Sequence, residues 1–537
     1  AVQRIQDVRT LKAHQFPEDA GPLAHPVRPS KYIEINNFYT ATVYEKGAEL
    51  CRMILTLLGA DDFRAGMDLY FERHDGDAAT IEDFIACFEE ASGESLSQFM
   101  RWYEQAGTPD VAAEFSWDRA SETATLTLTQ HIPATPGQAT KKPHQIPVAI
   151  GLLDSDGHDI PLKLKKDGPL DDKLIQLTRR EQTFQFTDVT SRPTASLFRQ
   201  FSAPVNVAYA QSDADLAFLM AHDSDTFNRC QAAQTYATRV IREMVEALQA
   251  GKRAGLGTGF AHALADTISD EGLDPAFRAL LLAIPGEGDI ARQIGTNVDP
   301  DAIHKARNQL RRTIGRTLEK ELEALYRTHK DTGPYSPHAE AVGKRALRNA
   351  ALGMLTANPD AKTPARVLRH FRSATNMTDQ IAALSILSHT QTPEREKAFL
   401  AFYKRWKDDH LVIDAWFSQQ AGSTAPGTLK RVRDLMDHEL FSLRNPNKVR
   451  ALIAPLAMNN PVTFHSSDGE GYRLVADTVM SLDEINPQIA ARLLNAFRSW
   501  KTMETGRQRQ ARKQLQRISR KKNLSPDVFE ITSRTLN

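Results

Sequence analysis

The sequence predicts a multidomain, mainly helical protein that contains one small antiparallel β-sandwich, and three observations support this. The 537 residues exceed what one hydrophobic core can organise, since a domain usually holds about 100 to 200 residues. Apolar and polar residues alternate with a period of two in one block, which begins at Thr108. Helical periodicity occupies the chain on both sides of that block. We therefore expect domains at residues 1–107, 108–209 and 210–537.

Residues 1–107 have the pattern of the end of a helical domain. The segment opens irregularly, because four prolines interrupt it: Pro17, Pro22, Pro26 and Pro29. Residues 43–58 then place apolar side chains on one helical face. Thr80 and Asp83 form a predicted capping box in front of a helix over residues 81–91.

The block at residues 108–209 has the pattern of short strands. Ala124, Leu126 and Leu128 alternate with threonines, and residues 146–153, 183–186 and 205–209 are also strand-like. Turn signals occur at Asp156-Gly157 and Asp167-Gly168. About a hundred residues of this kind predict a small antiparallel sandwich.

Residues 210–537 show helical segments of about 10 to 18 residues and no further strand pattern. Several helices are predicted to start where a polar capping residue precedes a proline, as at Thr363-Pro364, Asn445-Pro446 and Asn486-Pro487. The segments do not repeat with a strict period, so we expect a degenerate solenoid of helix pairs.

The composition is that of an ordinary globular protein. Charged residues make up 25% and hydrophobic residues 41%, while Lys plus Arg and Asp plus Glu both number 67. This balance favours neither nucleic acid nor an acidic membrane as partner, and the basic run 507–522 alternates with apolar residues as a solvated helix face does. No apolar run approaches the ~20 residues of a membrane span.

Three cysteines, Cys51, Cys87 and Cys230, lie far apart within apolar helical patterns. Such spacing favours reduced core thiols over a disulfide framework. We therefore expect a reducing, cytoplasmic setting.

No complete catalytic set can be identified from the residues alone. In the one His-Glu pair, His438-Glu439, Ser442 stands three positions after the glutamate, so the zinc-binding HExxH pattern is absent. The sequence also lacks a CxxC pair, a GxSxG elbow and a phosphate-binding GxxxxGK[ST] loop. We expect no metal to be bound by this chain.

The segment 32–49 concentrates polar groups in an otherwise apolar stretch: Asn36, Asn37, Tyr39, Tyr44 and Glu45. Two interpretations are open. The tyrosines are either core aromatics with satisfied hydroxyls or parts of a site, and their spacing alone favours the core.

Several motifs resemble the aminopeptidase N family of zinc peptidases. NNFYTATVYEKGAEL at 36–50 is similar to the family's NNFYTxTVYEKGAE segment, and FERHDG at 71–76 followed by Ala79-Thr80 is similar to its FERHDGxAAT segment. Further similarities follow in the same order along the chain, at Trp102-Tyr103, Gly107-Thr108-Pro109, 201–205, 376–379 and 442–450. The resemblance thus extends from end to end.

The resemblance implies the end of a thermolysin-like catalytic domain, an Ig-like sandwich and a HEAT- or ARM-like solenoid. It also implies that the full-length enzyme binds zinc through an HExxH helix and a following glutamate, which in the family lie upstream of the matching segment. By its place in this motif, Tyr44 corresponds to the family's tyrosine that stabilises the oxyanion. A phenol suits that role because it remains a hydrogen-bond donor at neutral pH. Tyr39 would line the pocket for the first substrate side chain.

A second group of site residues is implied in the helical region. Gln488 and Arg492 are four residues apart and share a helix face, while Arg450 lies early in another helix. A lone arginine is usually solvated or paired with a nearby carboxylate. The resemblance instead implies that Gln488 shapes the first pocket and that Arg450 and Arg492 meet the peptide's C-terminal side, because an arginine fork matches a carboxylate.

Two hypotheses follow. The chain is either the C-terminal part of a zinc aminopeptidase, inactive by itself and monomeric when full length, or a non-catalytic scaffold that binds peptides or a partner protein. The absence of an initiator methionine favours a fragment, and the resemblance implies peptide substrates with basic or small apolar N-terminal residues.

Overall fold

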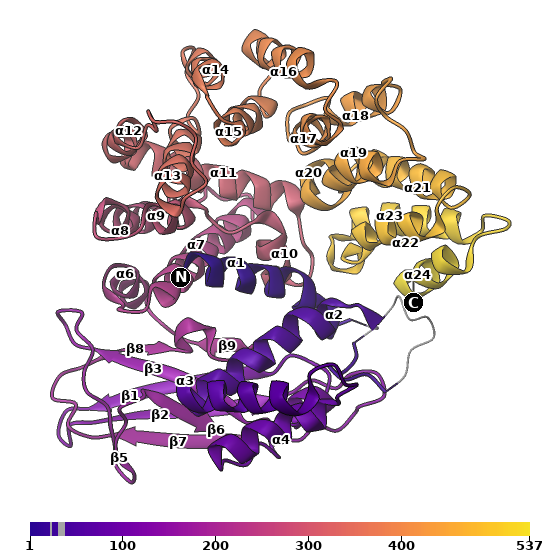
Figure 1. The fold of residues 1–537 in the computed structure, drawn as a ribbon. Helices are drawn as coiled ribbons and strands as arrows, with labels where there is room; N and C mark the ends of the chain where they lie inside the picture. The colour runs from indigo at the N-terminus through magenta and orange to yellow at the C-terminus, as the bar shows by residue number, and fades with distance from the viewer. Residues whose placement is uncertain (22–23, 31–37, 537) are drawn as a thin grey trace. The chain divides into compact units, whose positions relative to one another are not determined.

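The computed structural model describes residues 1–21, 24–30 and 38–536. The chain forms two compact units, Ala1–Tyr236 and Ala237–Asn537, and each is described by itself (Figure 1). The predicted three-domain division stays a prediction. In the described part of the chain, no helix combines the length and apolar character required to cross a bilayer.

The first unit begins with helices: α1 (Val2–Thr10), η1 (Leu11–Gln15), α2 (Phe16–Asp19), η3 (Thr42–Lys46), α3 (Gly47–His74), α4 (Ile81–Ser92) and α5 (Arg101–Glu104). The predicted irregular start is wrong for residues 2–19, because Pro17 occupies the first turn of α2, where no N–H bond is lost. The predicted capping box is confirmed: Thr80 accepts from the Asp83 N–H, and Asp83 accepts from the Thr80 N–H. Both η1 and η3 are single π-helical turns.

Helices α3 and α4 pack closely at Gly66 of α3. α3 bends at Gly59, whose φ of 80° is left-handed, and continues past Gly66. A Cβ added at Gly66 would lie 2.4 Å from Cδ1 of Phe88, a fully buried side chain of α4. The absence of a side chain at Gly66 therefore sets the distance between the two helices.

We expect Gly66→Ala to destabilise the first unit by about 1–3 kcal/mol, the usual range for overpacking. Alanine would gain only about 1 kcal/mol from its better helix propensity, so the clash with Phe88 should win. Urea unfolding of the wild-type and variant chains measures the difference. Gly353→Ala is a matched control, because a Cβ at this helical glycine meets nothing within 4 Å. A Gly66→Ala chain as stable as the wild type would contradict the packing argument.

The strands of the first unit are β1 (Asp110–Asp118), β2 (Thr123–His131), β3 (Ile146–Leu153), β4 (Lys163–Leu164), β5 (Gly168–Pro169), β6 (Leu174–Leu177), β7 (Glu181–Phe186), β8 (Thr194–Leu197) and β9 (Asn206–Tyr209). They form one sheet in the order β5-β4-β7-β2-β1-β9 and another in the order β6-β3-β8. The described pairs are antiparallel except β1 with β9, which is parallel.

One buried apolar cluster joins the helices and the sandwich of the first unit. It includes Leu50 and Ile54 of α3 together with Leu126 and Leu128 of β2 and Val148 of β3. The alternation in β2 buries every second residue from Ala124, as the period-two pattern predicts. The helical segment before the sandwich is thus held on it by a shared core.

Helices follow the sandwich to the end of the chain. They are α6 (Asp213–His222), α7 (Thr226–Gln249), α8 (Thr258–Ser269), α9 (Pro275–Leu282), α10 (Glu287–Ile294), α11 (Pro300–Thr317), α12 (Glu319–Thr328), α13 (Ala339–Leu355), α14 (Thr363–Ser373), α15 (Met377–Ser388), α16 (Pro393–Trp406), α17 (His410–Ala421), α18 (Thr428–Met436), α19 (Pro446–Asn459), α20 (Pro461–Phe464), α21 (Glu470–Leu482), α22 (Pro487–Leu494), η5 (Asn495–Phe497), η6 (Trp500–Thr502), α23 (Thr505–Ser519) and α24 (Pro526–Leu536).

Within the second unit, successive helices alternate between two rows. Figure 1 shows α12, α14, α16 and α18 in the outer row and α13, α15, α17 and α19 in the inner row. The helices from α14 to α24 bury one continuous apolar core, from Val367 to Val528. The predicted fold class, mainly helical with a small sandwich and a C-terminal array of helix pairs, is confirmed.

The helix starts follow the predicted signals with one exception. Asn445 and Asn486 cap α19 and α22, and a proline lies in the first turn of each helix. Thr363 is not the cap of α14, because Lys362 holds that position and Asp360 accepts the N–H groups of Lys362 and Thr363. The aspartate is a better acceptor for this turn than the threonine hydroxyl.

The three cysteines are free thiols, as predicted. Cys87 and Cys230 are buried and Cys51 is partly buried. Burial raises the pKa of the Cys230 thiol and of the Cys51 thiol, which keeps both protonated at neutral pH.

Candidate functional site

Tyr39 and Tyr44 lie together on the surface of the first unit. Their rings stack with centroids 6.2 Å apart and an interplanar angle of 27°. Tyr39 is 60% exposed and Tyr44 is 58% exposed, so the interpretation of both as core aromatics is wrong. No hydrogen bond links either hydroxyl to another residue in the described part of the chain, which leaves both available to a ligand. Asn36 and Asn37 lie outside the described residues.

Tyr44 belongs to the π-helical turn η3, and the first residue of that turn is tied to α2. The Glu18 carboxylate accepts hydrogen bonds from the Thr42 N–H at 2.9 Å and from the Thr42 hydroxyl at 2.6 Å. The Gln15 amide donates to the same hydroxyl at 3.4 Å. These bonds fix the start of a turn whose wider winding is unusual in proteins and often occurs at functional sites.

The last residue of the turn, Lys46, is tied down by a buried ion pair. Its ammonium lies 2.8 Å from the Asp19 carboxylate and donates to the Gly107 carbonyl at 3.1 Å. Asp19 also accepts from the Gly107 N–H and the Thr108 hydroxyl. Both charged side chains are about 1% exposed, so nearly the whole pair is removed from water.

Charge and hydrogen bonding keep Asp19 ionised in this buried place. Burial alone would raise the pKa of Asp19, but the Lys46 ammonium and bonds from Lys46, Gln15 and Gly107 together lower it. The Lys46 ammonium also lies 5.9 Å from the ring centroid of the buried Trp102. The ion pair thus locks η3 to α2 and to the segment that enters β1.

A second buried ion pair follows one turn later. The Arg4 guanidinium binds both oxygens of Glu49 at 2.5 and 2.7 Å and donates to the carbonyls of Gln200 and Phe201. The turn that presents Tyr44 is therefore anchored at both ends and again in α3. The sequence does not predict these anchoring contacts, because the partners lie 24 to 45 residues apart; they are made by Arg4, Glu18, Asp19 and Glu49.

The other predicted site residues belong to the second unit. Gln488 and Arg492 project from the exposed face of α22, whose opposite face buries Ile489 and Leu493. Arg450 is exposed on α19, which packs against α22, and donates to Asn447 at 3.1 Å. The structure thus brings Tyr39 to Tyr44 in one unit and places Arg450, Gln488 and Arg492 on two adjacent helices in the other.

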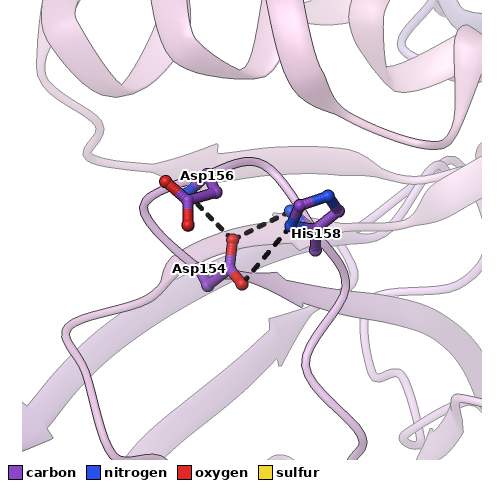
Figure 2. Close-up of side chains that lie close together, drawn as sticks. All are labelled: Asp154, Asp156 and His158. Carbon is purple, nitrogen blue, oxygen red and sulfur yellow. Dashed lines mark hydrogen bonds and ion pairs between the residues drawn. The ribbon is translucent and has the colours of Figure 1, made fainter.

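One group of side chains has metal-ligand chemistry among the described residues. Figure 2 shows Asp154, Asp156 and His158 around the turn after β3, with ligand atoms within 4.8 Å of one another. Asp154 closes this turn by accepting the N–H groups of Asp156 and His158 at 2.9 Å. The turn geometry explains the cluster, and Asp156 and His158 are exposed. The cluster also offers a single imidazole, whereas catalytic zinc sites are usually built from two or three histidine or cysteine ligands, so it does not fit such a site.

Comparison with known proteins matches family models along the whole chain. Residues 3–103 match the peptidase family M1 domain, residues 107–210 match a domain of unknown function, DUF3458, with an Ig-like fold, and residues 213–537 match the ARM repeats of DUF3458_C. The boundaries between these matches fall close to the start of β1 and the start of α6.

The full chain is similar to curated bacterial proteins. It is 42% identical over 536 residues to aminopeptidase N of Escherichia coli and 45% identical over 537 residues to aminopeptidase N of Caulobacter vibrioides. In both cases the match covers 100% of this chain and 61% of the relative. The chain thus corresponds to the C-terminal part of these relatives and spans less than two thirds of their length.

A solved structure agrees with the sequence matches. The crystal structure of Legionella pneumophila aminopeptidase A in complex with aspartic acid superposes with a TM-score of 0.83 at 30% sequence identity. The superposition covers 95% of this chain and 58% of that protein.

Proposed function

Because this chain belongs to the aminopeptidase N family of M1 peptidases, we propose that it works as the C-terminal part of a zinc aminopeptidase that removes N-terminal residues from peptides. The observation behind this proposal is Tyr44: within the M1-matching segment, an exposed phenol sits on a turn whose two ends are anchored by buried polar contacts. Such fixed placement is what a group that stabilises a transition state requires.

Tyr44 acts in this proposal as a hydrogen-bond donor to the oxyanion. When water attacks a peptide carbonyl, negative charge grows on the carbonyl oxygen, and a preorganised donor stabilises that charge more than it stabilises the substrate. A phenol stays protonated at neutral pH and can donate. The anchors at Thr42 and Lys46 limit how far the Tyr44 backbone can move as the charge develops.

The remaining site residues bind the substrate in this proposal. Tyr39, stacked on Tyr44, lines the pocket for the first side chain, and Gln488 helps to shape that pocket. Arg450 and Arg492 meet the C-terminal side of the peptide, where a guanidinium can bind a carboxylate through two hydrogen bonds. Arg492 has no ion pair within the described residues, and Arg450 has only a neutral partner, so both are available for this task.

Zinc enters the proposal through the family alone. The described residues offer no set that fits a catalytic zinc ion, and we place its ligands outside these 537 residues. We derive no step through the metal. The proposed enzyme is monomeric and cytoplasmic, and the free, buried thiols of Cys87 and Cys230 are consistent with a reducing compartment.

The proposal is tested with two proteins. One is this chain alone, and the other is a chimera in which the N-terminal part of the Escherichia coli relative, which this chain does not match, precedes it. We expect the chain alone to contain no zinc and to leave alanyl and arginyl fluorogenic amides intact, while the chimera binds zinc and hydrolyses both.

Either of two results would contradict part of this account. Zinc-dependent turnover by the chain alone would place the metal ligands within these residues. A folded, zinc-loaded chimera without turnover would instead favour the non-catalytic scaffold that binds peptides or a partner protein.

A further inference from the structure

The second unit contains a basic pocket on the outer row of helices. The pocket has a volume of about 730 Å³ and lies between α12 and α14, which are successive helices of that row in Figure 1. Its lining consists of three residues of α12, Glu323, Tyr326 and Arg327, and five of α14: Arg366, Arg369, His370, Arg372 and Ser373. The pocket is wide and largely open to solvent, so a ligand would be held by the charged side chains that line it.

The positive charge of the pocket exceeds its negative charge. Four arginines line it, whereas Glu323 is the one carboxylate in the lining. Glu323 binds Arg366 through both of its oxygens and lies 3.7 Å from Nε of Arg327. Arg369 and Arg372 are exposed and form no ion pair with any described residue. The guanidinium groups of Arg369 and Arg372 are therefore free to bind a ligand. Arg366 and Arg327 share one carboxylate, that of Glu323.

Aromatic contacts hold part of the lining in place. The Arg366 guanidinium carbon lies 4.7 Å from the ring centroid of Tyr326, and that of Arg348 lies 4.8 Å from the same ring. The Tyr326 hydroxyl is hydrogen-bonded to Nδ1 of His370 at 3.0 Å. Burial first, and then the nearby Arg348, lower the pKa of His370 to about 4, so this ring is neutral at pH 7. The ligand charge must therefore be met by the arginines.

We propose that this pocket binds the phosphate group of a small phosphate monoester. A carboxylate would neutralise one guanidinium, whereas a phosphate dianion offers nearly two charges and three acceptor oxygens to the surplus of arginines. Planar guanidinium forks suit such oxygens well. The volume of the pocket leaves room for the organic part beyond the phosphate itself. This site is independent of the proposed peptidase site.

Calorimetric titration of the 537-residue chain with glycerol 3-phosphate, inorganic phosphate and acetate tests the proposal. We expect saturable binding of glycerol 3-phosphate. If inorganic phosphate binds as tightly as glycerol 3-phosphate or more tightly, the ligand of this site is the free phosphate ion. Acetate binding as tight as that of the phosphates would overturn the proposal, because the pocket would then not select a phosphate group.

Substitutions separate the pocket from general surface charge. Arg369→Gln with Arg372→Gln should weaken phosphate binding about tenfold or more, because two charge-assisted hydrogen bonds are lost. Glu323→Gln should strengthen it, because the carboxylate that competes for Arg366 is removed. Arg312→Gln with Arg316→Gln removes the same two charges from exposed positions on α11 and should have no effect.

Helical circular dichroism confirms that each variant is folded before it is titrated. If the Arg312/Arg316 double variant binds phosphate as weakly as the Arg369/Arg372 double variant does, net charge alone attracts phosphate and the proposed site is rejected. Unchanged affinity in both the Arg369/Arg372 pair and the Glu323 variant would also reject it.

Discussion

Replacing Tyr44 with phenylalanine should lower kcat of the zinc-loaded chimera on alanyl amides by about 100- to 1000-fold, the usual cost of losing one oxyanion donor. KM should change little, because the hydroxyl is proposed to act in the transition state and not in substrate binding. The ring itself stays in place, so its stacking on Tyr39 is preserved. Steady-state kinetics of the wild-type and variant chimeras give both values.

Tyr335→Phe is the matched control for this experiment. Tyr335 is 64% exposed, as open to solvent as Tyr44, and it lies in the second unit beside Arg345. Its substitution should leave kcat unchanged. If Tyr44→Phe lowers kcat no more than Tyr335→Phe does, the phenol is not the oxyanion donor and the catalytic role proposed for this turn is wrong. If Tyr44→Phe raises KM and leaves kcat unchanged, Tyr44 binds the substrate and does not stabilise the oxyanion.

Much of the fold could be predicted because its signals are local. The alternation of Ala124, Leu126 and Leu128 predicts β2, and the Thr80–Asp83 pair predicts the start of α4. The parallel pairing of β1 with β9 could not be predicted, because the two strands lie almost a hundred residues apart. The alternation of apolar and polar residues in a strand does not say which other strand it pairs with. The Thr363-Pro364 signal does not give the cap of α14, because Asp360 accepts the N–H groups of Lys362 and Thr363 and the Thr363 hydroxyl donates to the same carboxylate.

The candidate site shows the same division. The resemblance predicts Tyr39 and Tyr44 as site residues, whereas their spacing alone favours the core, and only the structure shows that both are exposed. The three-residue spacing of Arg366, Arg369 and Arg372 is visible in the sequence, but their shared pocket depends on Glu323, about forty residues earlier. A periodic pattern identifies a helix face, whereas the neighbour that faces it is fixed by tertiary packing.

Substituting Lys46 with methionine should destabilise the first unit by about 3–5 kcal/mol, because removal of one partner leaves a buried charge uncompensated. Asp19 would keep its bonds from Gly107 and Thr108 but lose its counter-ion. Urea-dependent hydrogen exchange of the peptides that cover α2 and η3 measures this local loss. Lys166→Met, an exposed lysine of the same unit with no ion pair among the described residues, should change the stability by less than about 0.5 kcal/mol.

A double variant, Lys46→Met with Asp19→Asn, distinguishes an uncompensated charge on Asp19 from the lost hydrogen bond between Lys46 and Gly107. It should recover part of the stability, since no buried charge remains.

The pH dependence gives a second test of the Lys46–Asp19 pair. The folded-state pKa of Asp19 is lowered, so the stability that the wild-type pair contributes is present above about pH 4 and is lost as the pH falls through the folded pKa. The gap between wild type and Lys46→Met should therefore narrow in acid. A gap that stays constant as the pH falls through that pKa, with no recovery in the double variant, would mean that Lys46 stabilises η3 through its hydrogen bond to the Gly107 carbonyl and not through its charge.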